Sequence, residues 1–86
     1  MKVIISPRAE KNLKRLSKID QIAIVKKIRE LKDRQIIQEE KLKGFPNIFR
    51  ARVGDFRIVF RHDSSEIYII LIGHRKDIYD LLKRLF

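Results

Sequence analysis

The chain has no cysteine, and it has only 3 glycines and 2 prolines among its 86 residues. The absence of cysteine excludes disulfide bonds, thiolate nucleophiles and cysteine-ligated metal ions. The low glycine and proline content, together with 44% hydrophobic residues, is typical of a folded globule. The longest apolar run, residues 67–72, is far too short to cross a membrane. The first residues lead directly into a strand-like segment without the features of a signal peptide, so we expect a cytoplasmic protein.

Acidic residues are scarce as well, since 11 Asp and Glu stand against 21 Lys and Arg and give a formal net charge of +10. Small soluble domains usually carry a net charge of about 2–8 in magnitude, so this chain is unusually basic. Basicity of this size indicates a nucleic acid, an anionic membrane surface or an acidic protein as partner. The charge alone does not indicate catalysis.

The order of apolar segments and turn signals predicts one α+β domain over residues 1–86. We expect a strand near residues 2–5, then a helical hairpin that starts at Ser6-Pro7 and whose second helix runs from an N-cap at Asp20 to about residue 33. The apolar stripe of that second helix consists of Ile22, Ile24, Val25, Ile28 and Leu31. A polar connection covers residues 35–44.

An antiparallel meander of three strands is predicted next, near residues 48–53, 56–61 and 66–72. The last of these strands is apolar on both faces, which indicates an interior position in the sheet. A short C-terminal helix follows, with Asp77 or a neighbour as its N-cap.

The most informative segment is residues 48–60, IFRARVGDFRIVF, whose first strand alternates apolar residues with arginines. Gly54-Asp55 is a two-residue hairpin signal, with glycine at the first central position as a type II′ turn requires. Closing the hairpin at this turn sets apolar residues opposite one another on one face: Val53 with Phe56, Ala51 with Ile58 and Phe49 with Phe60.

The other face of this hairpin sets Arg52 directly opposite Arg57, with Arg50 and Arg61 nearby. Like charges opposed across a ladder destabilise a sheet, so stability does not explain this arrangement. Arginine binds phosphate in bidentate fashion through its planar guanidinium. A solvated or salt-bridged face is the alternative, but the nearby acidic residues lie at the turns. We therefore favour an anion-binding face.

The chain order brings further polar residues towards this face. Arg75 leaves the end of the last strand, and Tyr79 follows four residues later, near the start of the final helix. Nearby cations favour the phenolate, which makes Tyr79 a candidate proton acceptor, although a half-buried structural role is more common for tyrosine. His74, beside Arg75, is a candidate for contacting RNA. The two histidines have no carboxylates at ligand spacing and predict no metal site.

In their order and spacing, these segments resemble the RelE branch of the RelE/ParE superfamily of toxin–antitoxin toxins. The resemblance covers nearly the whole chain. It rests on the opening strand with its Ser-Pro helix start, the helical hairpin, the segment KLKGFP at residues 41–46, the R-x-R…G-x-F-R-I-V-F hairpin, and Ile72-Gly73-His74-Arg75 followed by Asp77-Ile78-Tyr79.

The resemblance implies roles for individual residues. Arg57 matches the arginine that binds the scissile phosphate, and Arg75 and Tyr79 match catalytic positions after the last strand. Arg50 and Arg52 stand where the best-known members have lysines; because arginine keeps its proton, proton transfer shifts to Tyr79 or to ribosomal RNA. The residues expected to bind RNA are Arg50, Arg52, Arg61, His74, Lys41 and Lys43.

RelE toxins cleave messenger RNA in the ribosomal A site and are silenced by a co-expressed antitoxin. We therefore expect a toxin of a type II pair that acts as a ribosome-dependent, metal-independent endoribonuclease without a cofactor. Its expected partners are mRNA, the ribosome and a small acidic antitoxin protein. Two alternatives stay open: a ParE-like inhibitor of DNA gyrase and a non-catalytic module that binds RNA or the ribosome. ParE relatives generally lack this set of arginines and tyrosine, which favours RNA cleavage.

Overall fold

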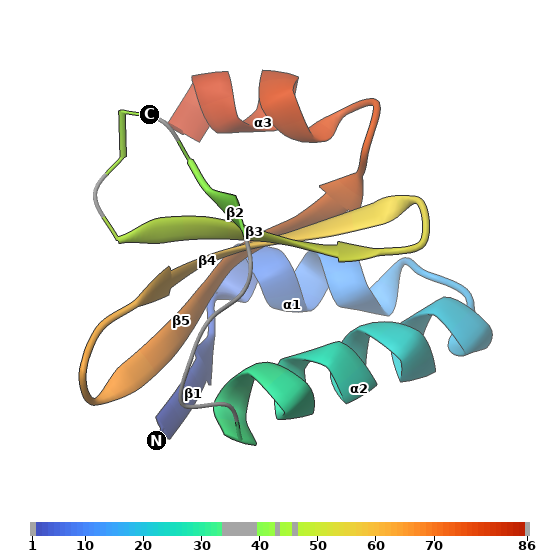
Figure 1. The fold of residues 1–86 in the computed structure, drawn as a ribbon. Helices are drawn as coiled ribbons and strands as arrows, with labels where there is room; N and C mark the ends of the chain where they lie inside the picture. The colour runs from blue at the N-terminus through green and yellow to red at the C-terminus, as the bar shows by residue number, and fades with distance from the viewer. Residues whose placement is uncertain (1, 34–39, 43, 46, 86) are drawn as a thin grey trace.

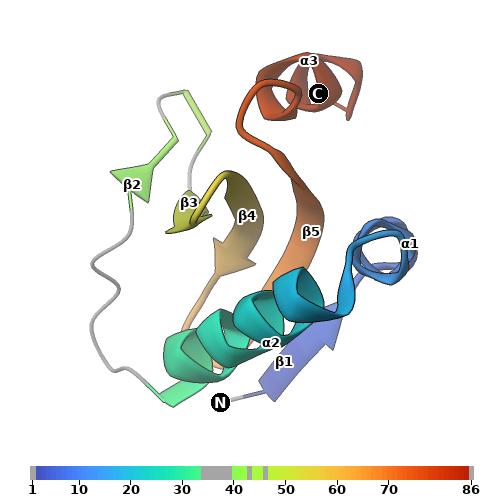
Figure 2. The ribbon, with the colours of Figure 1, turned by 90° about the vertical axis from the view of Figure 1, so that its right-hand side faces the viewer.

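The computed structural model describes residues 2–33, 40–42, 44–45 and 47–85. In chain order these residues form β1 (Lys2–Ile5), α1 (Pro7–Lys14), α2 (Lys18–Asp33), β2 (Glu40–Lys41), β3 (Ile48–Val53), β4 (Phe56–His62), β5 (Glu66–His74) and α3 (Ile78–Leu85). The sheet carries α2 on one face and α3 on the other, while α1 runs alongside β5 (Figures 1 and 2). The predicted α+β fold is confirmed. Within the described ranges, no helix has the length and apolar character needed to span a membrane.

The five strands form one sheet in the order β1-β5-β4-β3-β2. β1 runs parallel to β5, and all other neighbouring strands are antiparallel. β5 lies inside the sheet, as its apolar residues predict. β2 differs from the prediction of an unbroken polar connection over residues 35–44. A strand of two residues carries no alternation that a sequence pattern could reveal. The rest of that connection lies mostly outside the described residues.

Two apolar cores hold the sheet between its helices. One core lies between the sheet and the α1–α2 pair and contains Ala9, Ile24, Ile28, Leu31, Ala51, Ile58, Phe60, Ile67, Ile69 and Ile72. The other lies beneath α3 and contains Ile48, Val59, Leu71, Ile78 and Leu82. Burial of a large aliphatic side chain contributes about 1.5–3 kcal/mol, so the second core is the main reason why α3 stays on the sheet.

Two details of the helical hairpin differ from the sequence prediction. The N-cap of α2 is Ser17 and not Asp20, because Ser17 Oγ accepts a hydrogen bond from the Asp20 amide at 3.2 Å. Ile22, predicted within the apolar stripe, is 61% exposed. At 3.6 residues per turn it lies about 160° around the helix from Ile24, whose side chain is fully buried with that of Ile28 close by.

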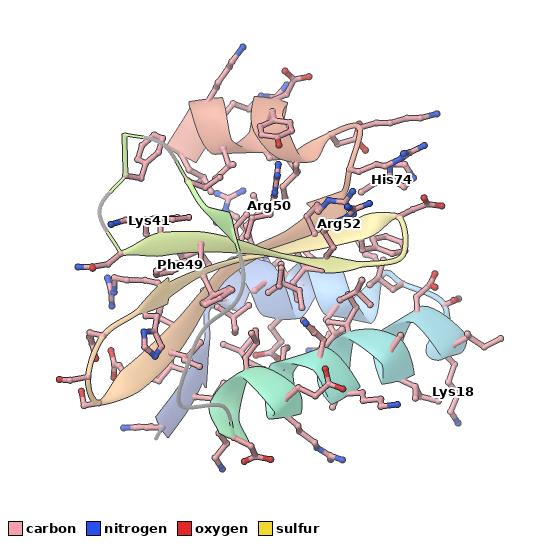
Figure 3. All side chains as sticks on the ribbon, viewed as in Figure 1. Lys18, Lys41, Phe49, Arg50, Arg52 and His74 are labelled. Atoms are coloured by element: carbon pink, nitrogen blue, oxygen red, sulfur yellow. The ribbon has the colours of Figure 1, made fainter. Side chains whose placement is uncertain are left out.

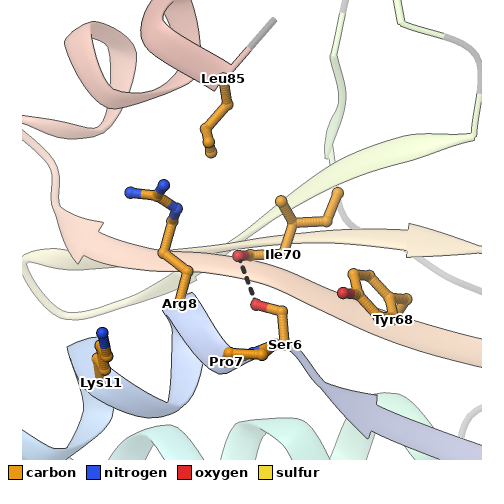
Figure 4. Close-up of a pocket in the computed structure, with 7 residues that line it drawn as sticks. All are labelled: Ser6, Pro7, Arg8, Lys11, Tyr68, Ile70 and Leu85. Carbon is orange, nitrogen blue, oxygen red and sulfur yellow. Dashed lines mark hydrogen bonds between the residues drawn. The ribbon is translucent and has the colours of Figure 1, made fainter.

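α1 closes the edge of β5 beyond the point where β1 ends. Ser6 Oγ donates to the Ile70 carbonyl at 2.8 Å (Figure 4). The same hydroxyl accepts a hydrogen bond from the Ala9 amide at 3.0 Å. Asn12 Oδ1 accepts a hydrogen bond from the Ile72 amide at 3.1 Å. Two side chains therefore satisfy backbone groups that would otherwise need another strand. The Ser-Pro signal both starts the helix and anchors it to the sheet.

We predict that Ser6→Ala lowers the free energy of unfolding by about 2 kcal/mol, because the helix loses its cap and the Ile70 carbonyl loses its donor. Ser17→Ala removes only an exposed cap and should cost about 0.5–1 kcal/mol. Chemical denaturation of both variants beside the parent protein measures the difference. Equal losses would show that the hydrogen bond to β5 contributes nothing.

Candidate functional site

The β3–β4 hairpin has the predicted register. Val53 pairs with Phe56, and Arg52 pairs directly with Arg57, so the opposed arginines are confirmed. Gly54 has a φ of +57°, while Asp55 does not have a positive φ, as a type II′ turn requires. The alternation of apolar residues and arginines in the sequence therefore correctly predicts the basic face of the hairpin.

Four arginines, a lysine and a tyrosine line a pocket with a volume of about 560 Å³. We call it the arginine pocket, and its lining residues are Arg50, Arg52, Arg57, Arg75, Lys76 and Tyr79. The hairpin supplies the first three residues, the connection after β5 supplies the next two, and α3 supplies the tyrosine. The labelled side chains of Arg50 and Arg52 leave β3 on the side of the sheet that α3 covers (Figure 3). Antiparallel pairing of β4 with β5 sets Arg57 opposite Gly73, which brings the connection after β5 to the hairpin.

Arg57 is the one charged side chain among the described residues that is buried, with 8% exposure. Its Nη1 donates to the carbonyl oxygens of Gly54 at 3.0 Å and Phe56 at 2.8 Å, which holds the guanidinium against the turn. Burial, followed by repulsion from the three neighbouring arginines, lowers the pKa of Arg57, and Asp55 partly opposes this change. An arginine keeps its proton near neutral pH even so, which makes Arg57 a rigid, fixed cation.

Tyr79 lines the arginine pocket and stacks with Arg50. The Arg50 guanidinium carbon is 5.5 Å from the centre of the ring, and Tyr79 is 49% exposed. A cation–π contact at an exposed site contributes about 0.5–1 kcal/mol and orients the ring. Tyr79 therefore lies close to the arginines, while its role as a proton acceptor stays a prediction.

The position of Tyr79 depends on how closely α3 approaches the sheet. α3 begins after Asp77, whose carbonyl accepts a hydrogen bond from the Leu81 amide at 3.1 Å, in agreement with the predicted cap. A Cβ at Gly73 would lie 3.1 Å from Ile78 Cδ1 and 3.4 Å from Leu81 Cδ1. Glycine at this position therefore lets α3 sit close to β5.

Asp55 and Lys76 belong to this region although the sequence prediction does not include them. Asp55 accepts a hydrogen bond from the Arg75 amide through its carbonyl at 2.7 Å, and its Oδ1 is 3.7 Å from Arg75 Nε. Lys76 follows Arg75 directly, and that adjacency is the one signal in the sequence that could have identified it. For Asp55 the turn position was apparent, but its contact with Arg75 depends on strand pairing.

Arg61 lies on the same face as Arg57 but outside the arginine pocket. It forms an ion pair with Glu66 at 3.6 Å, and its guanidinium lies 5.1 Å from the centre of the Tyr68 ring. These contacts hold Arg61 near the other end of β4. Its assignment as an RNA-binding residue stays a prediction.

Two further predicted RNA-binding residues, His74 and Lys41, also lie outside the arginine pocket. His74 pairs with Phe56 and packs edge-on against that ring at 5.8 Å, on the face of the sheet opposite to Arg57. Lys41 is exposed on β2 and is not among the residues lining the arginine pocket (Figure 3). Lys43 lies outside the described residues. For all three, RNA binding stays a prediction. In the described part of the chain, no three His, Asp or Glu side chains are grouped to hold a metal ion.

The sequence matches a protein family over most of its length. Residues 3–79 match the model described as the ParE toxin of type II toxin–antitoxin systems, parDE. The chain belongs to the RelE/ParE toxin superfamily. A stretch of 41 residues is also 42% identical to Toxin RelE3 of Methanocaldococcus jannaschii. That stretch covers 48% of this chain and 47% of the RelE3 toxin, so the match spans about half the length of the curated relative.

Solved structures extend the likeness of this RelE/ParE toxin to nearly the whole chain. A chain of the RelB–RelE antitoxin–toxin complex from Methanococcus jannaschii is 27% identical, with a TM-score of 0.75 over 91% of this chain and 96% of that chain. A mutant of the E. coli toxin RelE in the free state has a TM-score of 0.78 at 21% identity, over 99% of this chain and 97% of that chain. The E. coli likeness supports the fold, and the Methanococcus jannaschii RelE chain together with the RelE3 match supports the RelE-like branch of the superfamily.

The opposed arginines should reduce the stability of the fold. We predict that Arg52→Gln raises the free energy of unfolding by about 0.2–1 kcal/mol at low salt, because it removes a like charge directly across from Arg57. The gain should shrink as salt screens the repulsion. Denaturation at two salt concentrations measures it, with Arg29→Gln on the exposed face of α2 as the control, which should change little. A destabilised Arg52→Gln variant would contradict the prediction.

Proposed function

We propose that this toxin is a ribosome-dependent endoribonuclease that cleaves mRNA in the A site by metal-independent attack of a 2′-hydroxyl. The observation that carries the proposal is the arginine pocket, in which four guanidiniums and a phenol share one surface. Preorganised guanidiniums are suited to a phosphodiester whose negative charge grows in the transition state. Membership of the superfamily and the likeness to RelE toxins support the same chemistry.

The proposed reaction is an internal transesterification. The 2′-oxygen forms a bond to the adjacent phosphorus, and the bond from that phosphorus to the 5′-oxygen of the next nucleotide breaks. The products are a 2′,3′-cyclic phosphate and a 5′-hydroxyl. One proton leaves the attacking 2′-hydroxyl and one is taken up by the departing 5′-oxygen, so the reaction needs no net proton and no co-reactant.

The geometry of the pocket suggests how its residues divide this work. Arg57, buried and held by two carbonyls, would stabilise the pentacoordinate transition state together with Arg75. Arg50 and Arg52 keep their protons and would position the RNA without acting as bases. Tyr79 would orient or deprotonate the 2′-hydroxyl. Because the pocket offers one candidate proton acceptor, the rate of cleavage would depend strongly on a ribosome that orients the substrate.

A small acidic antitoxin is the protein partner that we propose, besides the ribosome and its mRNA. The matched Methanococcus jannaschii structure is a complex of RelE with the antitoxin RelB. The net charge of +10 on this chain favours an acidic partner, and such a partner would also neutralise the arginine pocket.

Inhibition of DNA gyrase is the second candidate, because the matching family model is named for ParE toxins. That activity would require a protein contact and would not require a phosphate site with a tyrosine beside it. The third possibility, RNA binding without cleavage, would use the same arginines and would weaken steeply with salt.

Primer extension on mRNA from a purified translation reaction distinguishes these functions. We expect cleavage within A-site codons by the parent protein, about 100-fold or more slower cleavage by Arg57→Ala, and a similar loss for Tyr79→Phe. Arg29→Ala, which removes an exposed arginine of α2, is the matched control and should cleave normally.

A gyrase supercoiling assay is run on the same samples. Supercoiling inhibition without mRNA cleavage would favour the ParE-like activity, and salt-sensitive RNA binding without cleavage would favour the binding module. Normal cleavage by both Arg57→Ala and Tyr79→Phe would leave the nuclease function standing but overturn the assignment of the site.

A further inference from the structure

We propose that Asp55 is a positioning residue that holds Arg75 in the arginine pocket, so that it speeds cleavage while weakening RNA binding. The inference rests on the proposed cleavage reaction. It concerns a carboxylate that contacts Arg75 at a pocket lined by cations and a phenol, where a nearby negative charge would oppose the binding of RNA.

The turn between β3 and β4 contacts both of the arginines that would stabilise the transition state. The carbonyls of Gly54 and Phe56 accept hydrogen bonds from Arg57 Nη1, and the carbonyl of Asp55 accepts one from the Arg75 amide. Three consecutive backbone carbonyls are therefore bonded to Arg57 and Arg75. This turn fixes the backbone of Arg75 and the side chain of Arg57 relative to each other.

The Asp55 carboxylate adds a constraint on the side chain of Arg75. Its Oδ1 lies 3.7 Å from Arg75 Nε, so the carboxylate approaches the guanidinium from the Nε side. A phosphate can then use the terminal Nη1 and Nη2 donors of the same guanidinium. Asp55 thus orients Arg75 without occupying the whole of its hydrogen-bonding edge.

Stability does not account for this ion pair. The side chains of Arg75 and Asp55 are 56% and 69% exposed, and exposed pairs contribute about 0–1 kcal/mol to folding. The positive potential of the pocket is a larger effect, since five cationic side chains line it. Asp55 offsets part of this potential and reduces the long-range attraction for any polyanion, RNA included.

Binding and cleavage should therefore respond to Asp55 in opposite directions. Removing its charge strengthens attraction for RNA in the ground state, but leaves Arg75 less well placed for the transition state. Only interactions that are stronger in the transition state accelerate the chemical step. A purely electrostatic role would change binding alone, and a purely structural role would reduce both.

The test compares Asp55→Asn with Glu10→Gln. Glu10 is also an exposed carboxylate in an ion pair, 3.1 Å from Lys14 on α1, so the control makes the same change in net charge away from the pocket. Binding is measured with an mRNA that carries a 2′-deoxynucleotide at the scissile position, and cleavage is measured as a single-turnover rate on programmed ribosomes. Asp55→Glu restores the negative charge. The Asp55→Asn change is also made in an Arg75→Ala variant, which lacks the guanidinium that Asp55 would orient.

For Asp55→Asn we expect about threefold tighter binding at low salt and about tenfold slower cleavage. Glu10→Gln should cleave at the parental rate, and Asp55→Glu should recover part of the lost rate. In the Arg75→Ala background, Asp55→Asn should cause no further loss of rate, because no guanidinium remains to be oriented. Unchanged cleavage by Asp55→Asn, or an equal loss in both backgrounds, would overturn the proposal.

A measurement without activity separates this proposal from the proposed function. If the parent protein does not cleave mRNA, the nuclease assignment fails, and the NMR signal of the Arg75 Nε–H then tests the contact itself. A shift of that signal and faster hydrogen exchange in Asp55→Asn, absent in Glu10→Gln, would support the positioning role. An unchanged signal would overturn it.

Discussion

The antiparallel pairing of β4 with β5 is the interaction on which the rest of the structure depends. It sets Arg57 opposite Gly73, so that the chain leaving β5 passes the turn at Asp55 and carries Arg75 to the hairpin. The same pairing supplies Val59 and Leu71 to the core beneath α3. The β4–β5 pairing thus brings the pocket arginines together and also forms the surface on which α3, the helix that carries Tyr79, packs.

An irregularity in that ladder decides which residues can reach the pocket. Val59 pairs with Leu71 and Phe60 with Ile69, so Ile70 is an extra residue on β5. A bulge of this kind reverses the side-chain alternation on either side of it. Ile69 therefore faces the core with α2, Leu71 faces the core beneath α3, and His74 is directed away from Arg57.

The pocket gathers positive charge that the fold itself does not need. Arg52 opposes Arg57 across the ladder, and burial and neighbouring arginines lower the pKa of Arg57. The hairpin accommodates this through carbonyl oxygens of its own turn and through Asp55, and an anionic ligand would complete the compensation. Under the proposed function, this arrangement would favour phosphate binding at a cost in stability.

The sequence by itself determined the hairpin and its arginine face, because period-two alternation and a Gly-Asp turn are local properties that leave one register. It also determined the Ser-Pro start of α1 and the cap of α3, since caps are read within a few residues. Only the tertiary structure decided that Lys76 lines the pocket, that Asp55 contacts Arg75, and that Arg61 and His74 lie outside the pocket. β5 is apolar on both faces, so no alternation revealed its bulge. The exposure of Ile22 and the anchoring of α1 by Asn12 likewise depend on contacts between distant segments, which local patterns do not encode.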